Sequence, residues 1–93
     1  MITGVIKLTL HAPWVHSLKE KRMVVKSICG KAASKFNISI SEVEGNDLLQ
    51  TIVIGAAHVS NDGARCGAVL DNVIRFIEGN TEAEVVDIER EMR

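Results

Sequence analysis

The chain has 93 residues, of which 46% are hydrophobic and 25% are charged, and its formal net charge is -1. Disorder is typically accompanied by low hydrophobicity and a large net charge, so this composition excludes a disordered chain. Because the net charge is close to zero, there is no overall field to attract nucleic acid or anionic lipid. An electrostatic partner would have to recognise a local patch. The length predicts a single domain, residues 1–93, with one hydrophobic core.

The lack of a recognisable targeting signal and the use of cysteine predict a cytoplasmic protein. The longest apolar stretch, around Ile52 to Val59, is far shorter than the roughly 20 residues that cross a bilayer, and the amino terminus has no basic-then-apolar signal pattern. We therefore expect no membrane partner. Cys29 and Cys66 lie 37 positions apart without a CxxC or Cys/His metal spacing, which favours two reduced thiols in the core.

The first half of the chain predicts a strand followed by a helix. Apolar and polar residues alternate from Ile2 to Leu10, as in a half-buried strand, and Pro13 ends the pattern. The run 17–20, Ser-Leu-Lys-Glu, has the form of a capping box and predicts a helix start. The helix extends to about Asn37, and its predicted apolar face consists of Leu18, Val25, Ile28, Cys29, Ala32 and Phe36.

The second half predicts two strands, a helix and a last strand. Residues 38–41 alternate, 44–47 form a turn cluster, and the third strand is expected over 48–59. Ser60, Asn61 and Asp62 offer N-caps for a second helix, which Gly79 and Asn80 end. The last strand is expected over 85–92.

This order of elements predicts an α/β (α+β) fold, a ferredoxin-like βαββαβ sandwich. Its four-stranded antiparallel sheet would have the order 4-1-3-2, with both helices on one face. The opposite face would then be open and would carry Val5, Val53, Ala57 and Val59. Because an exposed apolar face more often marks a partner than bare surface, we expect a homodimer or larger homo-oligomer through it.

Several kinds of chemistry find no support in the sequence. The three histidines lack the spacing of a metal site, no serine stands in a GxSxG context, and the loop after the first strand lacks the Gly-rich, Arg-bearing character of acylphosphatases. No tyrosine occurs, and the three aromatic residues lie outside the central strands, which excludes RNA recognition by stacking on the sheet. We predict no metal and no cofactor, and a non-enzymatic role is favoured over an enzymatic one.

The first helix is strongly basic. Between Ser17 and Phe36, six basic residues stand against one acid, a net charge of +5. Lys19, Arg22 and Lys26 fall within about 60° on one flank and form a stripe that could contact phosphates. The alternative is a solvated helix face without a ligand.

The residues of the basic helix also belong to a longer set of motifs. These are His11-Ala12-Pro13, the run 17–22 (SLKEKR) with Val24-Val25 and Lys26-Ser27, Phe36-Asn37, Asp47-Leu48 with Gln50, Ser60-Asn61-Asp62, Val69-Leu70-Asp71 and Arg75-Phe76. They closely resemble the YlxP-like proteins, known as domain-of-unknown-function family 503. The resemblance implies a ferredoxin-like fold, bacterial origin and frequent gene neighbourhoods with translation-initiation and ribosome-maturation factors, without an established activity.

One segment departs from that family pattern. Where the family commonly has Gly-His-Gln-Asp-Leu-Trp-Gln, residues 44–50 read Glu-Gly-Asn-Asp-Leu-Leu-Gln, so an aromatic residue and a histidine are missing. Any family contact made by that hairpin would be altered here.

Two functional hypotheses follow. The first is a non-enzymatic accessory protein that acts near ribosomal RNA or a translation factor, with Lys19, Arg22 and Lys26 on phosphate and with Trp14, His16 and Asp47 at the edge of the site. The alternative is a small-molecule-binding or enzymatic domain with a pocket between the Pro13 loop and the Asp47 hairpin. In that pocket His11, His16 and Asp47 would supply acid or base groups.

Overall fold

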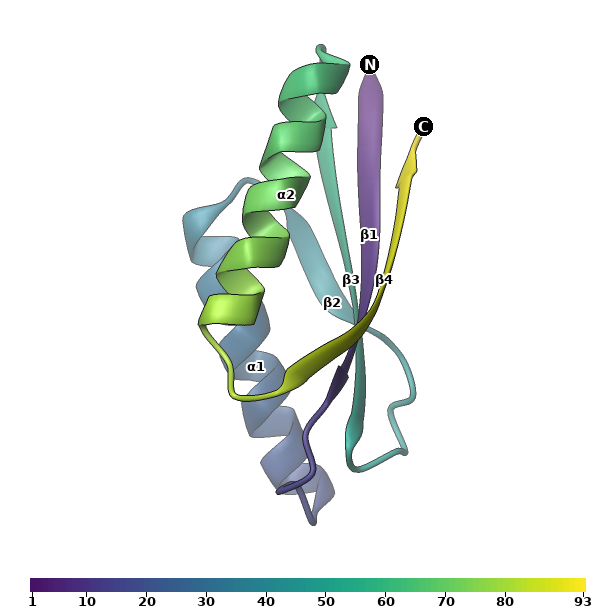
Figure 1. Ribbon diagram of the computed structural model, residues 1–93. Coiled ribbons are helices and arrows are strands. Elements are labelled where there is room, and N and C mark those ends of the chain that lie inside the picture. Colours follow the sequence, from purple (N-terminus) through teal and green to yellow (C-terminus); the bar gives the residue numbers. More distant parts are fainter.

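The computed structural model describes all 93 residues and contains the six predicted elements in the predicted order (Figure 1). Neither helix combines the length and the apolar character that a membrane crossing needs. The elements are β1 (Ile2–His11), α1 (Leu18–Lys35), β2 (Ser39–Glu44), β3 (Thr51–Ser60), α2 (Gly63–Gly79) and β4 (Glu84–Met92).

The sheet confirms the ferredoxin-like prediction. Its order is β2-β3-β1-β4, which is the predicted order read backwards, and every pair of neighbouring strands is antiparallel. Both helices lie on one face of the sheet, and the other face is open (Figure 1). The termini meet at one end, where Thr3 and Arg93 exchange two backbone hydrogen bonds of 2.8 and 2.7 Å.

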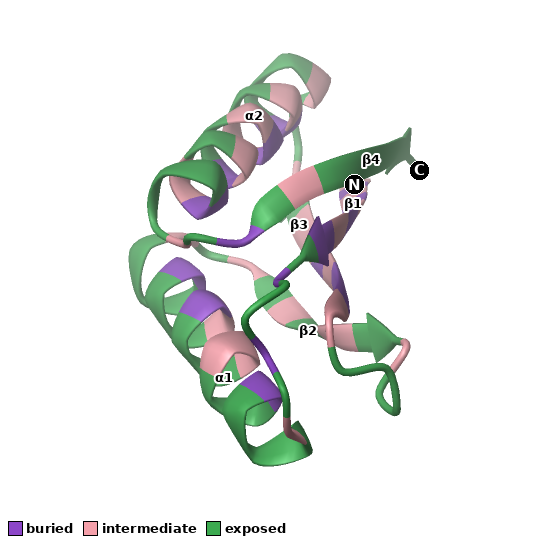
Figure 2. Ribbon diagram, turned by 60° about the horizontal axis from the view of Figure 1, so that its bottom comes forward, coloured by how far each residue is buried: buried purple, intermediate pink, exposed green.

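The core lies between the helices and the even-numbered face of β1. Ile6, Leu8 and Leu10 are buried there, because successive side chains of a strand point to opposite faces. They meet the buried stripes of α1 and α2, which Figure 2 shows on the sides of the helices that face the sheet. The buried core also contains Ala12, Val15, Ile28, Ala32, Ile52, Ile54, Ala56, Leu70, Val73, Ile77 and Ala83.

Two boundaries differ from the sequence prediction. β2 continues to Glu44, which we expected in the turn, and β3 starts only at Thr51, so Leu48 to Gln50 form a loop instead of the start of the strand. Apolar alternation continues through Leu48 and therefore predicts a strand. In the structure, Leu48 O accepts from the Lys21 side chain and Leu48 N donates to Gly45 O, so the main-chain groups of Leu48 lie outside the sheet ladder. Gln50 O accepts from Ala12 N, just beyond the end of β1.

β4 is an edge strand with a bulge. The register with β1 shifts between Thr9 and Leu10, which leaves Val86 as an extra residue between Val85 and Asp87. Val86, Ile88 and Met92 are 54%, 44% and 43% exposed. An exposed edge strand invites pairing with other chains, and acidic side chains along β4 oppose such pairing by charge repulsion.

The close approach of α2 to β1 depends on Gly4. A Cβ atom at this position would lie 2.6 Å from Cys66 Sγ and 2.7 Å from Leu70 Cδ1, so a side chain would force α2 away from the sheet. By contrast, nothing lies within 4 Å of a Cβ built at Gly30 on α1.

These two glycines predict opposite responses to the same substitution. Gly4→Ala should lower the free energy of unfolding by about 1–3 kcal/mol through overpacking. Gly30→Ala should raise it by about 0.5–1 kcal/mol, because alanine loses less conformational freedom in a helix. Denaturant unfolding of both variants measures the difference, and a stabilised Gly4→Ala would contradict the tight packing.

Candidate functional site

The start of α1 is fixed by the predicted capping box. Ser17 Oγ accepts a hydrogen bond from Glu20 N at 3.1 Å, and Glu20 Oε1 lies 3.3 Å from both Ser17 Oγ and His16 N, which donate to it. The capping groups satisfy N–H groups that would otherwise be orphaned at the helix start. The first turn, which bears Lys19, is therefore held in a defined orientation.

Lys19, Arg22 and Lys26 are all exposed on α1, and none of them forms an ion pair. We call these three residues the basic stripe. Of the eleven Lys and Arg residues, four form ion pairs. The seven cations without an acidic partner all lie on the two helices, and they are Lys19, Arg22, Lys26, Lys31, Lys35, Arg65 and Arg75.

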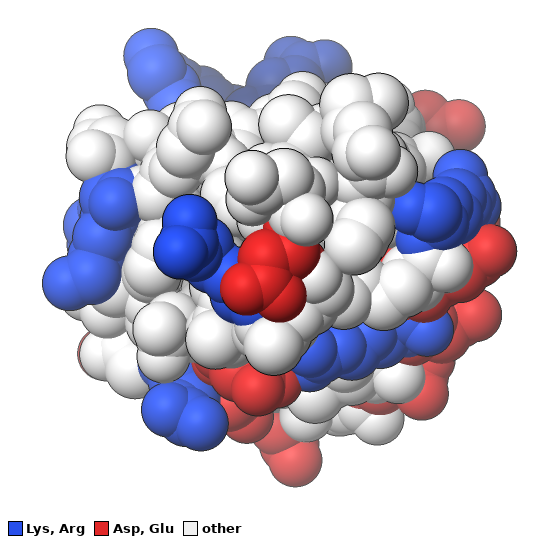
Figure 3. Space-filling model, turned by 90° about the horizontal axis from the view of Figure 1, so that it is seen from above, with Lys and Arg blue, Asp and Glu red and all other residues white.

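This distribution separates the charges of the molecule. In Figure 3, acidic side chains gather toward the right and the bottom, where basic side chains lie among them, whereas the left and the top carry mainly basic side chains. The separation gives a near-neutral protein a locally positive surface, because charges that face solvent without a partner keep their field.

Lys21 is an exception among the cations of the basic helix, because it is buried and has partners of its own. Its side chain is 2% exposed, and Nζ donates to Gly45 O and to Leu48 O, both at 2.5 Å. The same atom lies 2.9 Å from Glu42 Oε2, a buried oxygen without a hydrogen-bond partner whose charge this ion pair compensates. Two donors of the ammonium group are thereby used by main-chain carbonyl groups, and the carboxylate balances its charge.

The helical spacing of the sequence already indicates that Lys21 is buried. At about 100° per residue, Lys21 falls within about 20° of both Ile28 and Ala32, the centre of the apolar face. Leu18, predicted on that face, is instead 38% exposed. A lysine inside an apolar arc indicates a buried partner, since a lone buried charge is costly.

Glu42 also affects a neighbouring thiol. Burial and, to a smaller extent, the negative charge of Glu42 raise the pKa of Cys29. Cys29 is half-buried and Cys66 is fully buried, and both are free thiols, which agrees with the placement predicted from the sequence.

The three residues predicted at the site edge lie at the end of the molecule opposite the termini. Trp14 is 39% exposed, and His16 and Asp47 are exposed in the loops that follow β1 and β2. Gln50 joins these loops, because its Nε2 donates to Pro13 O at 3.0 Å and to Val15 O at 3.3 Å. The carbonyl groups on both sides of Trp14 are thus fixed by one amide.

The pocket of the alternative hypothesis is not present at this end. The structure contains three hollows, and no residue of the Pro13 loop or of the Asp47 hairpin lines any of them. The residues expected to supply acid or base groups therefore surround no cavity.

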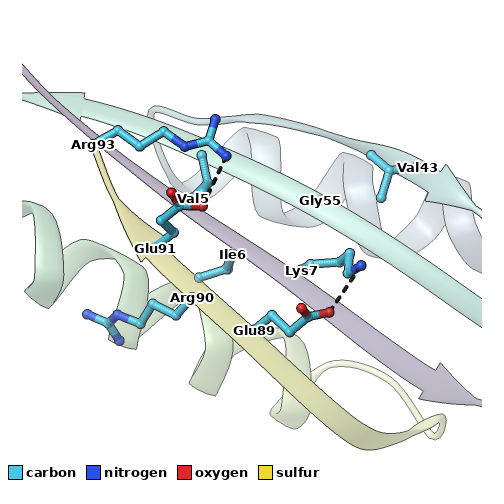
Figure 4. Close-up of a pocket in the computed structure, with 9 residues that line it drawn as sticks. All are labelled: Val5, Ile6, Lys7, Val43, Gly55, Glu89, Arg90, Glu91 and Arg93. Atoms are coloured by element: carbon cyan, nitrogen blue, oxygen red, sulfur yellow. Dashed lines mark hydrogen bonds and ion pairs between the residues drawn. The ribbon is translucent and has the colours of Figure 1, made fainter.

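Two of the hollows lie on the open face of the sheet. The first, of about 300 Å³, includes Val43, Gly55 and the charged residues Lys7, Glu89 and Glu91 (Figure 4). Lys7 Nζ lies 3.0 Å from Glu89 Oε2 and 3.2 Å from Glu44 Oε1, and these hydrogen bonds, first to Glu89 and then to Glu44, raise the pKa of Lys7. The charges of this hollow compensate one another.

The open face carries the four apolar residues predicted for it, since Val5 is paired with Ala57, Thr9 with Val53 and Thr3 with Val59. It is less apolar than we expected. Val53 is only 6% exposed, and the cluster of Lys7 with its two glutamates occupies the centre of the face. Val59, at 52% exposure, remains a large apolar side chain at the surface.

The fold and surface define a ferredoxin-like α+β sandwich with a basic helical layer. Residues 3–90 match the family described as protein of unknown function (DUF503), and the chain belongs to this family. It is similar to the uncharacterized protein YlxP of Bacillus subtilis (strain 168), with 41% identity over 68 residues that cover 73% of this chain and 74% of that protein. In fold it is similar to the de novo designed protein Foldit4, with a TM-score of 0.52, 11% identity and coverage of 99% and 94% of the two chains.

Substitution of Lys21 tests how the loops at the end of the molecule opposite the termini are held together. Lys21→Met should lower the free energy of unfolding by about 3–5 kcal/mol, because it removes the countercharge of the buried Glu42 Oε2 and the donor of two main-chain carbonyl groups. Lys26→Met, an exposed change on the same helix, should alter it by less than about 0.5 kcal/mol. Equal unfolding midpoints for the two variants would show that Lys21 does not hold the loop.

Proposed function

We propose that this protein is a non-enzymatic accessory factor that acts in the cytoplasm and binds RNA phosphates, in ribosomal RNA or a ribonucleoprotein of the translation machinery, through the basic stripe. The observation that carries the proposal is the segregation of charge: every cation without an acidic partner lies on the helical layer. Unpaired cations on a fixed scaffold suit contacts with a phosphate backbone.

The arrangement of the stripe supports this proposal. Lys19, Arg22 and Lys26 are three and four residues apart and occupy successive turns of one flank of α1. The helix that carries them is fixed by its capping box and by the buried Lys21. The phosphates would therefore meet a preformed backbone, and the ordering that opposes binding would be confined to the three side chains.

The stripe also limits the strength of binding. Three phosphate contacts imply a slope of log affinity against log salt concentration of about -2 to -3, which is a weak interaction for one copy. A useful affinity requires a second contact surface or a second copy of the chain, since linked contacts raise the overall affinity. A translation factor bound beside the RNA would supply such a surface.

Charge reversal of the stripe tests the proposal. The triple variant Lys19→Glu, Arg22→Glu, Lys26→Glu should fold normally, because all three side chains are exposed, and should lose co-sedimentation with ribosomal subunits. Wild-type binding should weaken with salt at the slope given above, which fluorescence anisotropy with labelled RNA measures.

A matched control separates the stripe from general charge. The first double variant, Lys19→Glu with Lys26→Glu, lies within the stripe. The control, Lys31→Glu with Arg65→Glu, replaces two exposed cations outside the stripe and changes the net charge by the same amount. Only the stripe pair should reduce association. If both pairs act equally, or if the wild type never associates with RNA at low salt, the stripe is a solvated helix face.

We further propose that two or more copies associate through the open face of the sheet, where Val5 and Ala57 are half-buried and Val59 is exposed. Association would cover these side chains and place two basic stripes on one particle. Sedimentation at micromolar concentration should therefore give at least twice the chain mass of 10.1 kDa. A monomer at every concentration would remove this proposal and leave the phosphate contacts of a single chain.

A further inference from the structure

The third hollow lies between the last turn of α1 and the middle of α2, away from the basic stripe. Its volume is about 440 Å³, which is within the range of small-molecule sites. Two aromatic rings, two cations and one amide surround it, and the lining residues are Lys35, Phe36, Asn72, Arg75 and Phe76.

The aromatic part of the hollow is preformed. Phe36 and Phe76 pack edge to face, with ring centroids 5.6 Å apart and an interplanar angle of 80°. Both side chains are half-buried and contact the core, so their positions are fixed by packing. A half-buried ring presents part of its surface to a planar ligand without the need to order a flexible side chain.

The cationic part has free donors. Lys35 makes no hydrogen bond or ion pair, and its Nζ lies 5.3 Å from the centroid of the Phe76 ring. Arg75 Nη1 reaches only Asn72 Oδ1, at 3.5 Å, which leaves most of the guanidinium donors available. Asp71, the residue before Asn72, is hydrogen-bonded to Arg90, and that hydrogen bond lowers the pKa of its carboxyl more than the charge of Arg75 does, so Asp71 compensates Arg75 only in part.

We infer that this hollow binds one nucleoside monophosphate unit. The base would lie against the two phenylalanine rings, the phosphate would accept from Arg75 and Lys35, and Asn72 would offer a donor and an acceptor to the base or sugar. A bound phosphate would compete with the Phe76 ring for the Lys35 ammonium, and transfer of the ammonium to the phosphate would free that ring for the base. An inorganic anion would use the cations alone, and an apolar ligand would use the rings alone.

The unit can come from a free nucleotide or from an unpaired residue of an RNA strand. An unpaired residue exposes its base for stacking, whereas a duplex keeps its bases stacked on one another. The RNA source rests on the proposed function, and the free-nucleotide source does not. The two sources therefore need separate measurements on the same variants.

The test compares two double variants with equal charge. Lys35→Gln with Arg75→Gln removes both cations of the hollow, and Lys31→Gln with Arg65→Gln removes one exposed cation from each helix outside it. Adenosine monophosphate, followed by NMR chemical-shift titration, should bind at least about tenfold more weakly to the first variant, because charged hydrogen bonds are lost. The second variant should bind like the wild type.

The same variants are then titrated with a labelled eight-nucleotide single-stranded RNA and with its duplex. The hollow variant should lose affinity for the single strand only. If the wild type binds adenosine monophosphate and no RNA, the site holds a free nucleotide and the proposed function fails. The inference is overturned if orthophosphate shifts the same resonances with equal affinity, if both double variants lose binding equally, or if adenosine monophosphate does not bind.

Discussion

The contacts of the buried Lys21 ammonium group hold together the end of the molecule opposite the termini. The group joins three pieces of the chain: α1, the edge strand β2 through Glu42, and the loop that follows β2 through two main-chain carbonyl groups. From Gly45 to Leu48 the loop lies outside the sheet ladder, so these bonds hold it in place of strand pairing. A buried charge is costly unless it is paired and hydrogen-bonded, and Lys21 meets both conditions, with two hydrogen bonds to carbonyl groups and one ion pair.

The same residue explains how a basic helix can lie on an apolar sheet. α1 uses one lysine as part of its buried face and keeps the other cations in solvent. On the open face and on β4, by contrast, the cations are matched by carboxylates, as Lys7 is by Glu44 and Glu89. The two layers therefore present different surfaces: on the sheet every cation is paired with a carboxylate, whereas on the helices most cations are unpaired. Net charge alone, at -1, hides this difference.

The sequence was sufficient to predict the fold because its signals are local and agree with one another. Alternation in β1, the capping box at Ser17 and the glycine at the end of α2 each define one element, and the handedness of βαβ units leaves few ways to arrange them. The position of the basic stripe also followed from helical spacing. Three features could not be predicted from local signals: the partners of Lys21, the loop at 48–50 and the hollow between the helices. Each depends on contacts between residues that are distant in the sequence. The resemblance to the YlxP-like family, confirmed by the match over residues 3–90, carried no residue roles that could have supplied them.

The departure from the family pattern at residues 44–50 takes on a definite meaning in this structure. The missing aromatic residue and histidine are side chains, whereas Lys21 holds the loop by the main-chain carbonyl groups of Gly45 and Leu48. Main-chain contacts of this kind do not depend on the side chains that the loop carries. Gln50, which the chain shares with the family pattern, fixes the carbonyl groups on both sides of Trp14. The side chains of the loop can thus differ while these main-chain contacts are kept, and Trp14 is the large aromatic side chain exposed at this end.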